Sequence, residues 1–246
     1  MHSLKQSTSR FGVAGGLLLA SLIGGAAWAQ TAQNIGVAAT VVNRMEGTVS
    51  AQKRVLGGGD KVFRDELIET GNDGKGQLLF LDETALTVGP NSHVTLDRFV
   101  YNPGGQSTVV MSATRGVFRF VSGSLPSQAY EIKTPAGVVG VRGTIFQLIL
   151  MPSGVATLQL IQGGVVWDTL QFGRLVMDRP GQSVTIPPPG GGRPQIVNGL
   201  TDQQAQMLAP IVDFGAGGIN TLPDGKNRAD EIRDQTRPSK GSINSD

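Results

Sequence analysis

Short hydrophobic runs separated by turn-forming residues dominate the chain between residues 41 and 186. The runs are rich in β-branched and aromatic residues, and several alternate with period two, as Val117 and Arg119 do against Phe118 and Phe120. Asn-Asp-Gly, Asn-Pro-Gly and Pro-Ser-Gly stretches stand between them. Short strands at such spacing are typical of all-β folds. The pattern therefore predicts an all-β domain, either an antiparallel β-sandwich or a barrel-like sheet.

A glycine followed within two positions by valine recurs at Gly47, Gly116 and Gly164, and this recurrence favours a β-solenoid as the alternative architecture. The intervals between these glycines are unequal and longer than one solenoid coil. The solenoid therefore ranks second.

The composition changes at Pro187, where the sequence reads PPPGGGRPQ. Consecutive prolines end strand pairing because proline has no backbone N–H to donate. We therefore expect the β-domain to span residues 30–186 and to be followed, over residues 187–246, by a Pro/Gly linker and a mostly disordered tail. A short helix over 201–209, with Thr201 as N-cap, is expected within this tail.

The first 29 residues have the features of a secretory signal. Lys5 and Arg10 precede an apolar stretch over residues 11–27, and an Ala-Trp-Ala box follows. Cleavage is expected between Ala29 and Gln30, which predicts a periplasmic or secreted protein without a transmembrane helix. An uncleaved membrane anchor is the alternative.

Charge and composition exclude several classes of function. The 21 basic and 19 acidic residues become 19 of each without Lys5 and Arg10, and the charges are scattered, so nucleic-acid binding is not expected. The chain has no cysteine, and His93 is its one histidine beyond the signal segment, so neither a zinc site nor another cofactor is expected. We interpret His93 as a polar residue at a strand edge.

Paired carboxylates would be the natural sign of hydrolase chemistry. The chain offers Asp65-Glu66 and Asp82-Glu83, but neighbours in a strand point to opposite faces, so we interpret both pairs as solvated hairpin ends. The triple glycine at residues 57–59 lacks the Lys-Ser/Thr ending of a phosphate-binding loop. The chain is therefore not expected to be an enzyme.

The segment TPAGVVGVRGTIF, residues 134–146, carries the most information. Alternation predicts Val139, Val141 and Ile145 on one face, and Arg142, Thr144 and Phe146 on the other. The glycines leave room for a bulge or a close backbone approach. A cation inside such a strand is expected to be clamped by backbone carbonyls or an acid, with a ligand-binding fork as the alternative.

This segment resembles the signature of the FecR-type domain, the periplasmic module of iron-siderophore signalling regulators. The residues that match the signature are Thr134, Pro135, Val141, Arg142, Gly143, Thr144 and Phe146. Residues 63–101, 115–123 and 161–167 are similar to the parts of the family domain around it.

The resemblance implies a non-enzymatic binding and signalling module that engages a protein partner in the bacterial envelope. The alternative is a structural β-scaffold with a tethering tail. Regulators of this family carry a sigma-factor-binding region before a membrane helix. Only residues 1–10 precede the apolar run here, so direct sigma-factor binding is not expected.

Overall fold

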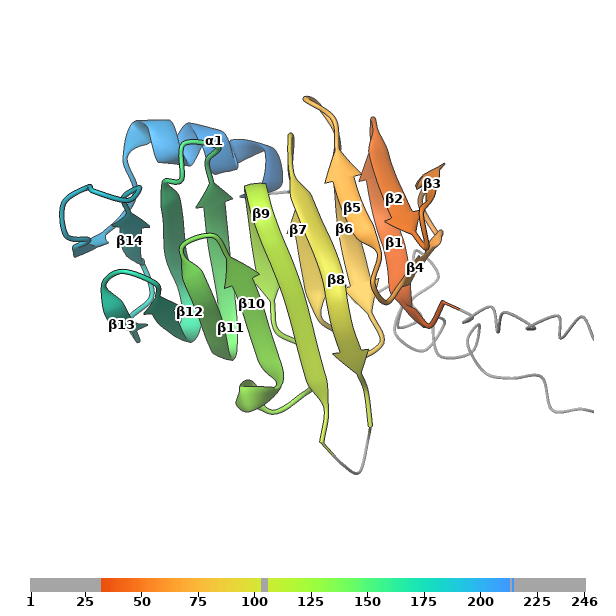
Figure 1. Cartoon of the computed structure of the whole chain (residues 1–246), viewed down its shortest axis with the longest axis horizontal. Coiled ribbons are helices and arrows are strands. Elements are labelled where there is room, and N and C mark those ends of the chain that lie inside the picture. Colours follow the sequence, from red (N-terminus) through yellow and green to blue (C-terminus); the bar gives the residue numbers. More distant parts are fainter. Residues whose placement is uncertain (1–31, 103–105, 213, 215–246) are drawn as a thin grey trace, which may run out of the picture. The chain divides into compact units, whose positions relative to one another are not determined.

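The computed structural model describes residues 32–102, 106–212 and 214, and this part of the chain is almost entirely β (Figure 1). The expected signal segment with its Ala29–Gln30 junction, and the tail after residue 214, lie outside the described residues. In the described ranges no helix has the length and apolarity needed to span a membrane.

The strands follow one another along the chain with few helical interruptions. They are β1 (Asn34–Val42), β2 (Met45–Val49), β3 (Gln52–Val55), β4 (Lys61–Phe63), β5 (Leu67–Thr70), β6 (Lys75–Phe80), β7 (Ala85–Val88), β8 (His93–Val100), β9 (Thr108–Val121), β10 (Tyr130–Thr134), β11 (Gly137–Leu150), β12 (Ala156–Thr169), β13 (Gly173–Met177), β14 (Gln182–Ile186) and β15 (Ile196–Asn198). A 3-10 turn, η1 (Ser127–Ala129), precedes β10, and α1 (Asp202–Val212) follows β15.

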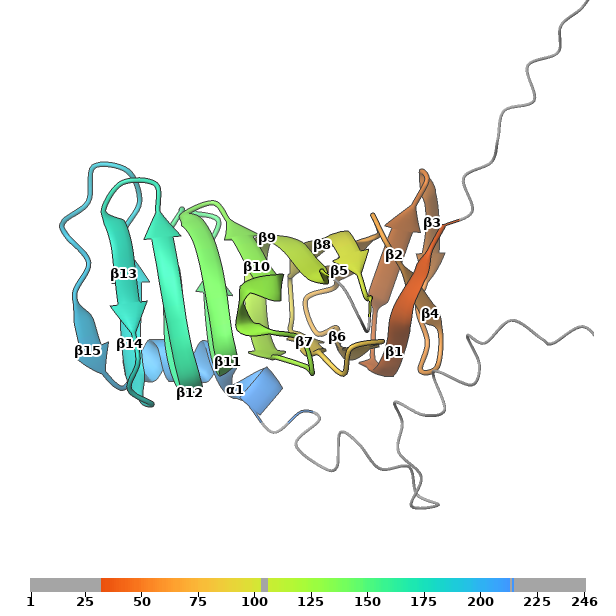
Figure 2. The ribbon, with the colours of Figure 1, turned by 90° about the horizontal axis from the view of Figure 1, so that it is seen from below.

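All these strands belong to one open sheet that doubles over into two layers. The first layer runs β15-β14-β12-β11-β9-β7-β6-β1-β4, and the second runs β13-β12-β11-β10-β9-β8-β5-β2-β3. Figure 2 shows β8, β5, β2 and β3 on one side and β7, β6, β1 and β4 on the other. The all-β prediction is confirmed.

The sheet differs from the expected antiparallel arrangement in one pairing. Among the described strands β9 and β10 pair in parallel, and the other pairs are antiparallel, so the sheet is mixed. Because the sheet does not close, the barrel-like alternative is not realised. A solenoid would require successive coils paired in parallel, so this alternative is not realised either.

The long strands β9, β11 and β12 take part in both layers, and the side of each strand that faces the core changes along its length. In β9 the core residues are Val109, Met111 and Ala113 in the second layer, but Phe118 and Phe120 in the first. The inward positions thus change from odd to even. The same change occurs in β11 and β12.

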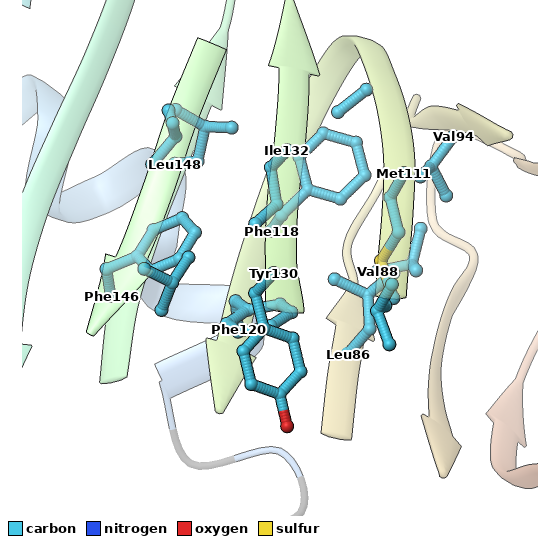
Figure 3. Packing of buried hydrophobic residues seen from close by; sticks show 14 of the residues in the cluster. Leu86, Val88, Val94, Met111, Phe118, Phe120, Tyr130, Ile132, Phe146 and Leu148 are labelled. Carbon is cyan, nitrogen blue, oxygen red and sulfur yellow. The ribbon is translucent and has the colours of Figure 1, made fainter. Parts of the chain in front are cut away.

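The main core lies between the two layers. Figure 3 shows Phe118, Phe120 and Phe146 of the first layer gathered with Ile132 and Met111 of the second. The Phe120 ring stacks on Phe146, with centroids 5.3 Å apart, and meets Tyr130 edge-on at 5.7 Å. Burial of large side chains of this kind is the main source of stability in a small domain.

The expectation that the folded unit ends at Ile186 is wrong. β15 pairs with β14, and α1 packs on the outer face of the first layer, where Leu208 and Ile211 are buried against Val117 and Ile149. The Thr201 cap is formed as expected, since its hydroxyl accepts a hydrogen bond from the Gln204 backbone N–H at 3.3 Å. The prolines end β14 but do not end the domain, because the few apolar residues that follow find a partner face.

A buried polar cluster joins the β6–β7 hairpin to the segment before β10. The Tyr130 hydroxyl donates to Asp82 Oδ2 at 2.8 Å, and the Thr84 hydroxyl donates to the same oxygen at 2.6 Å. The Ser124 backbone N–H donates to the Asp82 carbonyl at 2.8 Å. Burial first, and then the Asp82 carboxylate, raises the pKa of Tyr130 to about 12.

Replacing Ile211 with Ala should destabilise the protein, because the side chain is fully buried between α1 and the sheet. The expected loss is about 2–5 kcal/mol of unfolding free energy, measured by urea denaturation. Val212→Ala is the matched control because Val212 is 40% exposed, and it should change stability by about 0.5 kcal/mol or less. Equal effects of the two variants would mean that α1 does not dock.

Tyr130 should make stability fall at high pH. An unfolded chain ionises tyrosine near pH 10, whereas folded Tyr130 does so at about 12. Its contribution is therefore complete below about pH 10 and is lost as the pH rises through the folded value. An absorbance titration should show a late tyrosinate step that disappears in Tyr130→Phe, leaving the step of Tyr101, the other of the two tyrosines. Persistence of the late step in Tyr130→Phe would assign it to Tyr101.

Candidate functional site

The first part of the signature forms the tight turn between β10 and β11. The Thr134 hydroxyl donates to the Gly137 carbonyl at 2.7 Å and accepts from the Ala136 backbone N–H at 3.2 Å. Pro135 lies in the turn itself, where its fixed φ is suitable and its missing N–H is not needed. Thr134 and Pro135 therefore set the register of the hairpin.

The second part forms the bulge at which β11 and β12 change phase. Gly143 has φ of +60° and Gly163 has φ of +80°, and a Cβ on Gly163 would lie 2.1 Å from the Gly143 carbonyl oxygen. The pairing shifts between Arg142 and Ile145. Only glycine combines the left-handed backbone with such a close approach.

Thr144 holds the bulge together. Its side chain donates to the Gly164 carbonyl at 2.6 Å and accepts from the Arg142 backbone N–H at 2.9 Å. Its own N–H donates to the Ser122 hydroxyl at 2.9 Å, which ties the bulge to the end of β9. Three strands thus meet at one threonine that is 1% exposed.

The bulge overturns the predicted faces of the signature. Val139, Val141 and Phe146 all lie in the main core, whereas Ile145 is only partly buried on the other face. Strict alternation would put Phe146 on the opposite face from Val139 and Val141. The bulge inserts one extra residue into the strand between them, which brings all three to the same face. The prediction that Val139 and Val141 share a face is confirmed, and the placement of Ile145 and Phe146 is wrong.

Arg142 is not the clamped cation that the sequence suggested. Its side chain is exposed beside Gly143, and it makes no hydrogen bond or ion pair with the residues that the structure describes. The bulge turns this position outward, so the guanidinium needs no buried partner. The structural role in the signature belongs to the glycine and the threonine.

The two carboxylate pairs separate as expected, with one member of each pair turned inward. Glu66 and Asp82 are fully buried, so the interpretation as solvated hairpin ends is wrong for them. Glu66 accepts from Arg54 Nη2 at 2.8 Å and from the Phe63 backbone N–H at 2.8 Å. Both buried carboxylates are occupied by protein donors, as buried charges must be.

His93 belongs to a charged surface network at the edge of β8. Its Nε2 lies 2.6 Å from Arg115 Nη2 and 3.3 Å from Glu69 Oε1, and Lys53 bridges Glu69 and Glu46. Burial, and then the neighbouring Arg115 cation, lowers the pKa of His93 from its ordinary value. Within the described ranges no group of three His, Asp or Glu side chains has the spacing of a metal site.

A groove of about 510 Å³ lies between α1, the middle of β9 and the end of β11. Its wall is mostly apolar, with Arg115 as the charged residue, and it includes Val117, Leu150, Met151, Met207 and Pro210. This groove could not be predicted from the sequence, because α1, which forms one wall, was expected in the tail after the β-domain. None of the signature residues lines it.

Thr144→Val should destabilise the fold, because it leaves the Gly164 carbonyl and the Arg142 N–H without their partner. A loss of about 1–3 kcal/mol is expected from thermal or urea denaturation, and Thr144→Ser should recover much of it. Arg142→Ala is the control and should cost about 0.5 kcal/mol or less. The reverse order, with Arg142→Ala the more damaging, would show that the guanidinium holds the fold.

The family model described as FecR protein matches residues 66–166, which include β5 to β11 and most of β12. No curated protein matched the sequence.

Two solved structures from Parabacteroides distasonis, each described as a "putative anti-sigma factor", resemble the chain with TM-scores of 0.47 and 0.45 at 12% and 14% sequence identity. The similarity covers 58% of this chain and 63% and 64% of theirs. The chain thus spans less than two thirds of either structure, and the likeness carries no functional argument. The family match and the signature residues agree, and residues 66–166 carry a FecR-type domain.

Proposed function

We propose that the protein is a non-enzymatic periplasmic module that binds another protein of the bacterial envelope in a signalling pathway. The observation that carries this proposal is the FecR match over residues 66–166, in which the turn and the bulge of the signature are intact. The basic start, apolar run and Ala-Trp-Ala box support export.

The chemistry of the described side chains supports binding rather than catalysis. The buried carboxylates Glu66 and Asp82 are held by Arg54, Thr84 and Tyr130. A histidine that acts as a general base needs a nucleophile beside it. The neighbours of His93 are instead the charged side chains of Arg115 and Glu69. The rigid two-layer sheet instead offers broad surfaces on which a partner can dock.

Affinity capture from envelope extracts tests this function. The tagged protein should retain one envelope protein reproducibly, and excess untagged protein should compete it away at saturation. Deleting the gene should then change transcription in response to an envelope signal. The proposal is contradicted if excess untagged protein does not reduce the capture, or if transcription is unchanged in the deletion strain. Either result would favour a structural scaffold.

A further inference from the structure

Five polar residues form a straight row across the outer face of the first layer. Each is the direct register partner of the next: Gln77 on β6 with Thr87 on β7, Thr87 with Arg119 on β9, Arg119 with Gln147 on β11, and Gln147 with Gln159 on β12. Their neighbours along each strand point into the main core, so all five point outward. At 4.7–4.9 Å between strands the polar row is about 19 Å long.

Three of the five members of the polar row are almost completely buried. Thr87, Gln147 and Gln77 are 2%, 3% and 5% exposed. Neither they nor Arg119 make a side-chain hydrogen bond or ion pair with another residue in the described part of the chain. None of their side-chain nitrogen or oxygen atoms is among the fully buried atoms without a hydrogen-bond partner, so the small exposed part of each side chain includes its polar atoms. These polar atoms are open to an external ligand.

The surroundings of the polar row limit the shape of that ligand. Two residues further along β9 and β11, Val117 and Ile149 are covered by α1. On the opposite side of the polar row, two residues away along β6, β7 and β9, the apolar side chains of Leu79, Ala85 and Val121 form a strip. A narrow polar line between two apolar borders suits a thin, extended ligand that crosses the strands.

We propose that the polar row binds an extended, acidic segment of the partner protein. An extended backbone offers N–H and C=O groups in alternation, and each glutamine amide can both donate and accept. Arg119 has no carboxylate partner among the described residues, and its planar fork suits a carboxylate. A length of about 19 Å accommodates roughly six extended residues. This inference rests on the proposed function, since it names the chemistry of the partner.

The groove beside α1 does not have these properties. Its cation, Arg115, already donates to His93, and most of its wall is apolar. The polar row instead combines a cation and amides whose side chains have no partner among the residues that the structure describes. The polar row on the sheet face is therefore a better candidate than the groove for the binding site of an acidic segment.

The test uses the purified full chain and three defined probes: a synthetic peptide of alternating Ser and Glu, its Ser and Lys counterpart, and an oligogalacturonate as an anionic glycan. The Ser-Glu peptide should bind and shift the NMR signals of the Gln77, Gln147 and Gln159 side-chain amides. Arg119→Gln should weaken its binding about tenfold or more, and Gln147→Leu should weaken it several-fold. Arg142→Gln and Gln162→Leu, exposed positions outside the polar row, should change binding about twofold or less.

Three results would overturn the inference: no binding of the Ser-Glu peptide, equal binding of the Ser-Lys peptide, or preferential binding of the glycan. Unchanged affinity in Arg119→Gln would do so as well. Thermal unfolding identifies folded variants, and Gln77→Leu replaces Gln147→Leu should the latter unfold. Capture of the envelope partner separates this inference from the proposed function. If the double variant Arg119→Gln and Gln77→Leu still captures the envelope partner, the proposed function remains supported, and the polar row is not the site that binds the partner.

Discussion

The fold depends on one constraint, which is that β9, β11 and β12 must each present opposite sides to the core as they pass from one layer to the other. A regular strand cannot do this, because its side chains alternate strictly. In β11 and β12 the change takes place at Gly143 and Gly163, whose backbones come into contact, and Thr144 bonds across the junction. The doubled sheet and its core depend on this irregularity together with the separate change of side within β9, between Ala113 and Phe118.

The buried acids have a related role at other places in the sheet. Asp82 fixes the β6–β7 hairpin to Tyr130, and Glu66 joins Arg54 to the backbone of Phe63. Breaking a buried charge pair costs more than forming it gains, so such groups act chiefly to make alternative arrangements unfavourable. In this domain the charged residues that resemble catalytic groups in the sequence therefore specify the fold.

The outer face of the first layer is shaped by the same topology. Because the strands are in direct register there, residues as far apart in sequence as Gln77 and Gln159 lie in one line. α1 covers part of the face and leaves the polar row beside it. A row of amides and a guanidinium on a sheet is a chemically distinctive surface whose side chains are positioned by paired strands.

The sequence by itself determined the all-β class and the FecR signature, and it left room for a bulge or a close backbone approach near the glycines, because these depend on local periodicity and on residues with special backbone preferences. It did not determine the burial of Glu66 and Asp82, the exposure of Arg142, the docking of α1 or the polar row. Each of these depends on contacts between segments far apart in the chain, such as Asp82 with Tyr130 and Ile211 with Val117. Only the tertiary structure decided them, since a local pattern does not say which partner face a residue will meet.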